Sequence, residues 1–264
     1  MKILIVGDIV GSPGRRIFKT AVKRMRETEG IHAVVANAEN AAAGSGITDA
    51  LAEELFAAGA DVLTMGDHVW NQKGAELLMA REKRMIRPAN LPAACPGQGW
   101  TTVQTAIGPI TVISLLGRVF LPPVDCPFTC IDALLKRIPA GSPILVDFHA
   151  EATSEKIAMG WYLDGRVAAV VGSHTHVQTS DERLLPKGTA YLTDLGMTGP
   201  IDSVIGREIE PVLKKFTTGM PSRFEVAKGA AVMEGAVVDI DRATGRVVSI
   251  ARVRCRDDGA QLVD

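Results

Sequence analysis

Residues 3–8 read ILIVGD, an uninterrupted apolar run that ends in glycine and aspartate. A continuous run of this kind is typical of a strand that is buried on both faces of a parallel sheet. Four later segments also place metal-binding residues after an apolar run: AVVANAEN (33–40), ADVLTMGDH (60–68), PILVDFH (143–149) and AAVVGSHTH (168–176). In an open α/β sheet, ligands bind beyond the carboxyl ends of the strands. The sequence therefore predicts that these side chains converge on one site.

Helical patterns alternate with the strands. A helix is expected between Thr48, which fits an N-cap, and Gly59, which would end it. The βαβαβα order predicts parallel pairing and a layered sheet. The other expected helices span residues 15–29, 72–82, 128–138, 153–163 and 208–217, and the expected strands span 2–7, 32–38, 60–66, 143–148, 166–172 and 189–193.

Other segments follow a different pattern. Residues 101–107 and 110–116 flank Gly108-Pro109 and predict a hairpin, and residues 194–206 are expected to form a glycine-rich loop. The alternating tail predicts antiparallel strands around a turn at residues 241–245. Because no linker or repeat interrupts the chain, we expect one α/β domain over residues 1–264, with two sheets that face each other and helices outside.

Composition limits the classes of function. The 264 residues are 47% hydrophobic and 22% charged, typical of a globular protein, and 29 basic residues balance 30 acidic ones. No bulk field would attract nucleic acid or a membrane, so an extended nucleic-acid surface is not expected. No apolar run approaches the ~18 residues of a membrane span, and the N-terminus lacks a signal peptide's cleavage site. The four cysteines lack paired spacing, which favours reduced thiols and a cytoplasmic location.

Several motifs have more than one interpretation. The glycines of GDIVGSPG (7–14) are spaced like a degraded dinucleotide fingerprint, but Pro13 occupies the turn and GxGxxG is not present as such. Asp8 alone could be either a metal ligand or a helix N-cap. Glu39 could merely cap a turn, although the small residues 41–46 would let a ligand approach the backbone closely. A lone histidine such as His68 is more often structural than catalytic.

The histidines carry the strongest local signal. His174 and His176 are two residues apart, and on an extended segment both would point to the same side, where they could serve two adjacent metals or share one. An exposed polar loop is the alternative. Four of the five histidines follow expected strands, and only His32 begins one. Three carboxylates, one carboxamide and four imidazoles are enough for a two-metal centre: Asp8, Glu39, Asn40, Asp67, His68, His149, His174 and His176.

In order and spacing, these residues resemble the calcineurin-like metallophosphoesterases. More narrowly, GDIVGSPGR, NAENAAAGSGIT, DFHAEATSEK and GSHTHVQT are similar to segments of the bacterial 2′,3′-cyclic nucleotide phosphodiesterase family (YmdB type). The similarity covers essentially the whole chain. It implies a four-layer α/β/β/α sandwich of the metallophosphoesterase type with two metal ions, usually iron (Fe³⁺/Fe²⁺) or Mn²⁺.

The resemblance also implies a role for each matched residue. Asp8, Asn40 and His176 would hold one metal, and Asp67, His149 and His174 the other. Glu39 would bridge the two metals, and His68 would be the catalytic acid.

At two positions this sequence differs from the residues that are typical of the superfamily or the family. Val10 stands where the wider superfamily has a histidine, and Asn40 would supply the missing metal ligand. Asp67 stands where the family typically has asparagine. The extra negative charge would lower the Lewis acidity of the metals and favour a more highly charged pair.

These features predict a metal-dependent phosphodiesterase. It would hydrolyse 2′,3′-cyclic nucleotides such as 2′,3′-cAMP to 3′-nucleotides, by attack of a metal-bridging hydroxide with a histidine as general acid. The alternatives are a nucleotide-sensing regulatory metal-binding protein and a broader phosphatase or nuclease. A nuclease would need a basic groove, which the balanced charge does not favour. The expected partner is a small cyclic nucleotide, no membrane partner is expected, and a homo-oligomer is allowed.

Overall fold

The computed structural model describes residues 1–257 and 261–262, in which the strands form two sheets. The nine-stranded sheet has the order β15-β14-β13-β1-β3-β4-β5; off this path, β12 pairs with β13, and β2 pairs with β12. Strands β1, β3, β4 and β5 are parallel, whereas β13 and β14 run antiparallel to their neighbours. The strands are β1 (Lys2–Val6), β2 (Asp8–Ile9), β3 (Ile31–Asn37), β4 (Val62–Thr64), β5 (Met85–Ile86), β12 (Met197–Pro200), β13 (Ala231–Ile240), β14 (Val247–Arg256) and β15 (Gln261–Leu262).

The six-stranded sheet has the order β10-β11-β9-β8-β7-β6. Its centre is parallel from β7 to β11, and β6 and β10 are antiparallel edges. The strands are β6 (Trp100–Thr105), β7 (Gly108–Leu116), β8 (Ile144–His149), β9 (Ala169–Ser173), β10 (Arg183–Leu184) and β11 (Ala190–Leu192).

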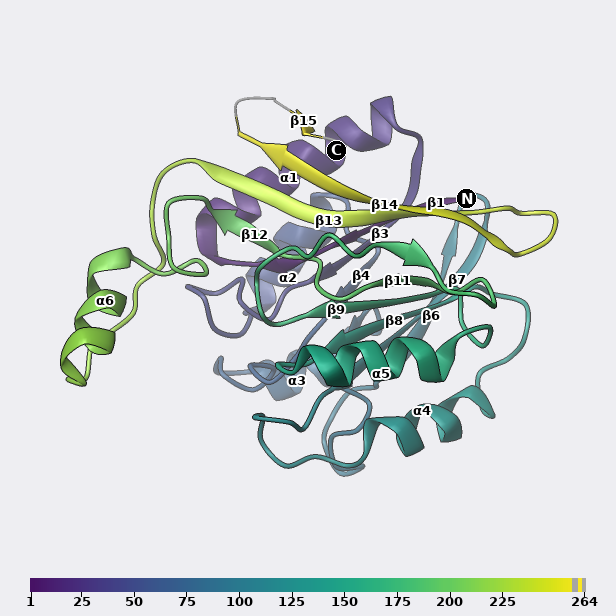
Figure 1. The fold of residues 1–264 in the computed structure, drawn as a ribbon, viewed down its shortest axis with the longest axis horizontal. Helices are drawn as coiled ribbons and strands as arrows, with labels where there is room; N and C mark the ends of the chain where they lie inside the picture. The colour runs from purple at the N-terminus through teal and green to yellow at the C-terminus, as the bar shows by residue number, and fades with distance from the viewer. Residues whose placement is uncertain (258–260, 263–264) are drawn as a thin grey trace.

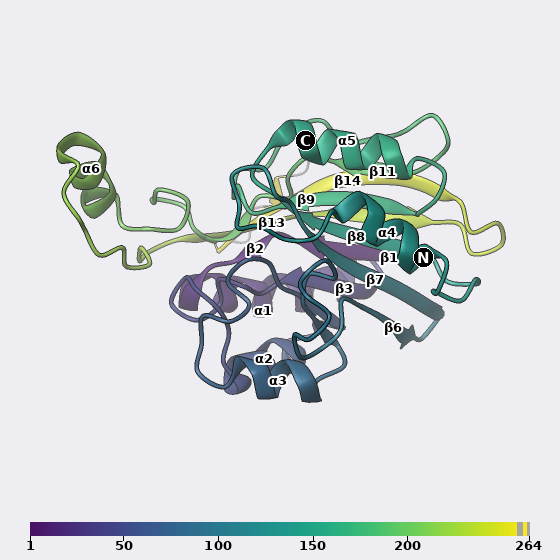
Figure 2. The same cartoon turned by 90° about the horizontal axis from the view of Figure 1, so that it is seen from below.

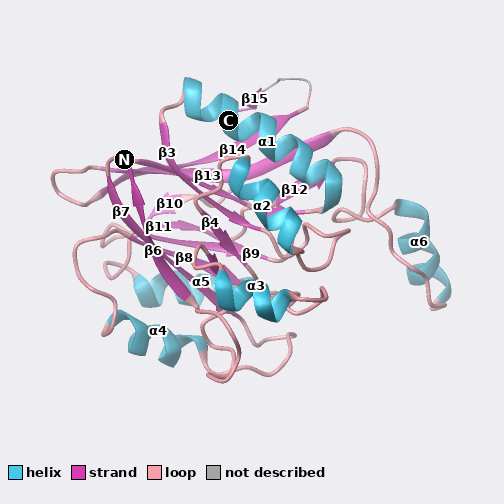
Figure 3. Ribbon diagram, turned by 180° about the vertical axis from the view of Figure 1, so that it is seen from behind, coloured by secondary structure: helices cyan, strands magenta, loops and turns pink. Residues whose placement is uncertain are grey.

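Helices cover the outer faces of both sheets (Figures 2 and 3). Helix α1 buries a stripe that includes Ile17, Phe18 and Met25. It begins at Gly11, earlier than expected, because Pro13 is tolerated in a first turn, where its missing amide hydrogen is not needed. The helices are α1 (Gly11–Thr28), α2 (Asp49–Ala57), α3 (Ala75–Arg81), α4 (Pro127–Leu135), α5 (Thr153–Leu163) and α6 (Ile209–Thr218).

Three buried clusters show how the layers are held together. One packs α1 to α3 against the nine-stranded sheet, with Phe18 and Leu55 among its members. A second, which includes Ile5 and Val171, lies between the sheets, and a third packs α4 and α5 against the six-stranded sheet. Burial of apolar area drives each contact. The expected four-layer α/β/β/α sandwich is therefore confirmed (Figure 2).

Most expected elements are present within a few residues, but two expectations were wrong. Residues 197–200, expected in a loop, form strand β12, because pairing with β13 and β2 outweighs the low strand propensity of glycine and proline. The turn of the β6–β7 hairpin lies at residues 106–107, and Pro109 belongs to β7 opposite Gln104. Proline is acceptable there, near the beginning of a strand.

The expected single domain over residues 1–264 stays a prediction, and residues 258–260 and 263–264 lie outside the described residues. None of the helices in the described part of the chain is long and apolar enough to cross a membrane.

Residues 201–230, here called the arm, carry α6 away from the layers (Figure 1). Of the ten helical residues only Val212 is buried. Leu213 and Phe216 are 52% and 79% exposed, so α6 presents apolar side chains outside the main cores. Gly219, with a φ of 70°, ends the helix in the left-handed conformation that favours glycine.

Candidate metal centre

The polar ends of strands from both sheets meet at one place. All eight candidate residues lie there, and each has a polar side-chain atom within 4 Å of another member of the set. The nine-stranded sheet contributes Asp8 after β1, Glu39 and Asn40 after β3, and Asp67 and His68 after β4. His149 ends β8, and His174 and His176 follow β9. The predicted convergence of these side chains is confirmed.

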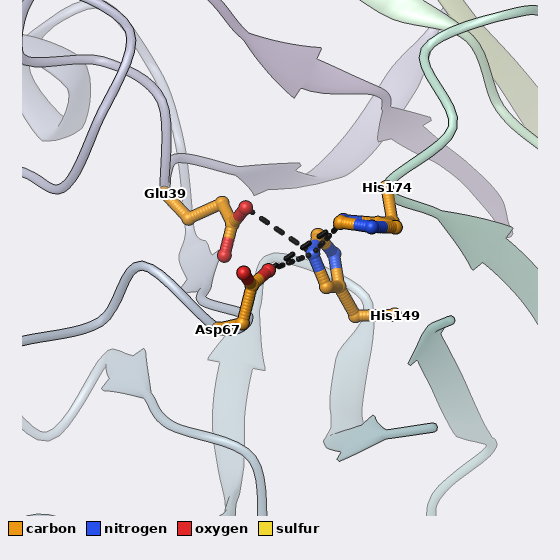
Figure 4. A group of neighbouring side chains, drawn as sticks. All are labelled: Glu39, Asp67, His149 and His174. Atoms are coloured by element: carbon orange, nitrogen blue, oxygen red, sulfur yellow. Dashed lines mark hydrogen bonds and ion pairs between the residues drawn. The ribbon is translucent and has the colours of Figure 1, made fainter. Parts of the chain in front are cut away.

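Four of these residues form a compact group of donors (Figure 4). One ligand atom from each of Glu39, Asp67, His149 and His174 lies within 4.8 Å of the others. His149 Nε2 is 3.1 Å from Asp67 Oδ1 and 3.2 Å from Glu39 Oε1. His174 Nδ1 is 3.0 Å from His149 Nε2. This is the donor chemistry of a metal with mixed oxygen and imidazole ligands.

A second group of donors also contacts Glu39. Asn40 Nδ2 is 3.3 Å from both His176 Nε2 and Glu39 Oε1. His176 Nε2 is 3.6 Å from Asp8 Oδ1, and both Asp8 and Glu39 are fully buried. Glu39 therefore contacts both groups.

Three imidazoles have an acceptor for their outer nitrogen. Ser173 donates its hydroxyl hydrogen to Asp147 at 2.6 Å and so accepts from His149 Nδ1 at 2.9 Å. His176 Nδ1 donates to the carbonyl of Ile205 at 3.1 Å, and His174 Nε2 is 3.2 Å from a Glu151 carboxylate oxygen. Their inner nitrogens face the carboxylates and could bind a metal once deprotonated. Such outer partners fix the tautomer of metal-binding histidines.

His68 differs from the other three imidazoles. Its Nδ1 is 3.0 Å from Asn40 Oδ1 and 3.3 Å from Glu39 Oε1, and its Nε2 is 3.7 Å from Asp67 Oδ2. Nδ1 thus has oxygen acceptors within hydrogen-bond distance, whereas Asp67 Oδ2 lies beyond hydrogen-bond distance of Nε2. Its side chain is 31% exposed, so His68 lies at the rim of the centre.

The pKa shifts agree with this geometry. The hydrogen bond to Glu39 raises the pKa of His68 above its usual value. Burial opposes charge on Glu39, but His149 outweighs it and keeps the carboxyl pKa well below its usual range. Burial likewise opposes charge on His149, but Glu39 and Asp67 raise its pKa well above the usual value. In the protein alone, protons on imidazoles balance the buried carboxylates.

Gly66 shows how closely these groups approach the backbone. A Cβ atom at this position would lie 2.3 Å from Glu39 Oε2 and 2.4 Å from His149 Nε2. Those distances are far below van der Waals contact. Only glycine therefore fits at position 66.

The expectation that His174 and His176 point to the same side because they lie on an extended segment was wrong. The segment is not extended, because His174 and His176 have φ of 93° and 62°, in the left-handed region. Both rings still reach the centre, because a turn rather than strand alternation directs them there. The sequence offers no local glycine or asparagine at these positions that would have revealed the turn.

A polar layer that was not predicted from the sequence lies behind His149. Asp147 accepts hydrogen bonds from Ser173, from Thr64 and, at 3.3 Å, from Asn37. Burial raises the pKa of the Asp147 carboxyl. A usable signal was present, because Asp147 interrupts the apolar strand β8 and the other three are polar residues at the ends of β3, β4 and β9.

The chemistry of the donor set fits a metal. Asp8, Glu39 and Asp67 all form their ion pairs with imidazoles. Several carboxylates brought together in a buried site need positive charge to be stable. A divalent cation supplies that charge and takes the lone pairs of the inner imidazole nitrogens.

Comparison with a solved structure bears on the fold. The chain superposes on the crystal structure of 5′-nucleotidase from Candida albicans with a TM-score of 0.53 at 11% identity, covering 96% of this chain and 50% of that one. A similarity at this level concerns the fold alone. Two facing sheets with helices on their outer faces make up a fold of the metallophosphoesterase type.

The family follows from more similar proteins. The chain belongs to the YmdB-like protein family, which it matches over residues 4–253. It is 48% identical to the 2′,3′-cyclic-nucleotide 2′-phosphodiesterase of Bacillus subtilis, covering 98% of each chain. A crystal structure described as a novel phosphatase from Mycoplasma pneumoniae superposes with a TM-score of 0.91 at 35% identity, covering 97% of this chain and 93% of that one.

Proposed function

We propose that this protein is a metal-dependent phosphodiesterase that hydrolyses 2′,3′-cyclic nucleotides, such as 2′,3′-cAMP, to 3′-nucleotides. The observation that carries the proposal is the arrangement of the imidazoles. His149, His174 and His176 lie deeper in the centre, with side chains 0, 19 and 10% exposed, whereas His68 lies at its rim, 31% exposed. The name of the B. subtilis relative supports the choice of substrate.

The proposed ligands form two sets that share Glu39. Asp8, Asn40 and His176 would hold one metal ion, and Asp67, His149 and His174 the other. The contacts of Glu39 with Asn40 and His149, at 3.3 and 3.2 Å, support its role as a bridge. We propose iron or manganese as the metal, because mixed carboxylate and imidazole donors suit both.

A bound pair of cations would neutralise the phosphate charge and supply an activated water. Hydrolysis adds the elements of water to phosphorus and breaks the bond to the 2′ oxygen, which must take up a proton. His68 Nε2 is the proposed donor. Its nearest acceptor, Asp67 Oδ2, is 3.7 Å away, beyond a hydrogen bond, so its proton is free for the substrate. The hydrogen bond to Glu39 raises the pKa of His68 above its usual value, which favours the form that carries this proton.

Turnover of a substrate panel, with metal analysis of the same sample, tests the proposal. The panel contains 2′,3′-cyclic nucleotides, 3′,5′-cyclic nucleotides, nucleoside monophosphates and RNA. We expect the 2′,3′-cyclic substrates to be cleaved fastest, to give a 3′-phosphate, and the activity to disappear with the metal. Metal-loaded protein that leaves every 2′,3′-cyclic nucleotide intact would contradict the proposal and favour the regulatory metal-binding alternative.

A broader phosphatase is the second candidate, because the similar M. pneumoniae structure is described as a phosphatase. The same panel separates the two, since a broad enzyme would cleave monophosphates at comparable rates. The expected cytoplasmic location and the homo-oligomer stay predictions.

A further inference from the structure

A cavity of about 250 Å³ lies between the metal centre and the arm. Its floor is formed by residues of the centre, including His68 and His176. Its wall is formed by apolar side chains of the arm, including Val212, Phe216 and Phe224. A polar reaction centre thus opens directly into an apolar space.

We propose that this cavity binds the nucleobase of the substrate. The inference rests on the proposed function, and it names the part of the substrate that lies next to the phosphate and ribose. A phosphate at the metal centre places a base within one sugar's length. A flat heteroaromatic ring is the part of a nucleotide that an apolar, aromatic wall can take up, since every base has a face on which a phenyl ring can stack.

The exposure of Phe216 supports this assignment. Phe216 is 79% exposed although it lines a cavity beside the centre. Ile205, which also lines this cavity, is 50% exposed, and exposed apolar side chains gathered at one place mark a binding surface. Phe224, which is half-buried, lies under Lys215, whose Nζ is 5.1 Å from the ring centroid.

Two residues of the arm, Arg207 and Ile205, fix the wall of the cavity relative to the centre. The guanidinium of Arg207 donates to the carbonyls of Ala43, Gly44 and Phe224, which ties the arm to the loop that follows Asn40. The Ile205 carbonyl accepts from His176 Nδ1 at 3.1 Å. The cavity is therefore held in a fixed position beside a proposed metal ligand.

A neighbouring cavity of about 360 Å³ fits a base less well. It reaches the centre only through His176. Its arginines, Arg252 and Arg254, lie 2.8 Å from Glu182 and 3.1 Å from Glu234. These ion pairs make its lining charged rather than apolar.

The test compares two substrates that differ only in the base. Hydrolysis of 2′,3′-cAMP and of methyl riboside 2′,3′-cyclic phosphate is measured on the metal-loaded wild type and on Phe216→Ala. We expect KM for 2′,3′-cAMP to rise about 5- to 100-fold, the usual value of one stacked base, with kcat little changed. KM for the substrate without a base should not change. Phe216→Trp should restore the low KM.

Leu213→Ala is the matched control, because Leu213 is an exposed apolar residue of α6 that does not line the cavity. It should leave both KM values unchanged. An equal effect of Phe216→Ala on both substrates, or none on either, would overturn the base site.

Calorimetric binding of 3′-AMP separates this inference from the proposed function. If no cyclic nucleotide is hydrolysed but Phe216→Ala still weakens 3′-AMP binding, the proposed activity fails and the base site stands. If turnover is present and 3′-AMP affinity is the same in wild type and Phe216→Ala, the base site fails and the activity stands.

Discussion

Lys156 and Asp194 form an ion pair in the interior, with Nζ 2.7 Å from Oδ2 and each side chain 1% exposed. The same Oδ2 accepts hydrogen bonds from the backbone amide and the hydroxyl of Thr175. Thr175 is the residue between His174 and His176, whose φ values are both positive. The ion pair therefore holds the turn that directs both imidazoles to the centre.

Removing one charge of this pair should be costly. Asp194→Asn leaves the Lys156 ammonium buried without its counter-charge, and we expect the free energy of unfolding to fall by about 3–5 kcal/mol. Denaturant unfolding measures the loss. Asp132→Asn, which removes an ion pair with Arg166 between half-exposed side chains, is the control and should change stability little. Equal effects of the two variants would show that the buried pair has no special role.

Glu39→Ala should remove both metals, because Glu39 contacts both groups of donors. His176→Ala should weaken mainly one metal. Elemental analysis of the purified variants measures the ratio of metal to protein, and the surface variant Glu53→Ala should match the wild type. Two metals retained by Glu39→Ala would rule out the bridge.

Asp67→Asn should keep two metals, because a carboxamide oxygen can still coordinate. It removes one unit of negative charge from the centre, so the metal preference or the pH optimum should shift. Activity profiles with Mn²⁺ and Fe²⁺ across pH provide the measurement. Profiles identical to those of the wild type would place Asp67 outside the ligand set.

Metal binding should depend on pH through His149. Burial alone would lower its pKa, but Glu39 and Asp67 raise it well above the usual value, and the proton must leave before Nε2 can bind a cation. Metal affinity should therefore keep rising with pH above about 6.5, the ordinary pKa of histidine. Competition titrations with Mn²⁺ between pH 6 and 9 test this.

The metal-free protein should show the opposite trend. A raised pKa in the folded state stabilises the protein fully below about pH 6.5, and this contribution is lost as the pH rises through the folded-state pKa. Tm of the metal-free protein should thus fall as the pH rises above about 6.5. His149→Asn should flatten both curves, whereas His32→Asn, outside the centre, should not. Flat curves in the wild type would contradict the coupling.

The parallel strands and most of the centre could be predicted because both depend on local pattern. An apolar run ending at Asp8 or His149 reveals a buried strand and its functional end together. The left-handed turn at His174 could not be predicted, because it is held by Asp194, a distant partner. Strand β12 was missed for the same reason, since its pairing with β2 and β13 is a property of the assembled sheets.

The proposed base site could not be found from sequence either. Phe216 lies on an amphipathic helix whose apolar side looks like an ordinary core face. Only the folded arrangement shows that α6 stands away from the layers (Figure 1). It also shows that Val212 and Phe216 of α6 line a cavity beside the metal centre.

The turnover of His68→Ala on two substrates tests the central claim most directly. The variant should retain two metals and bind substrate, but lose about 10²- to 10⁴-fold in kcat on 2′,3′-cAMP, the usual contribution of a positioned acid. The loss should shrink on a nitrophenyl phosphodiester, whose leaving group needs little protonation. An equal loss on both substrates would show that His68 does not donate the proton, and loss of metal would make His68 a ligand.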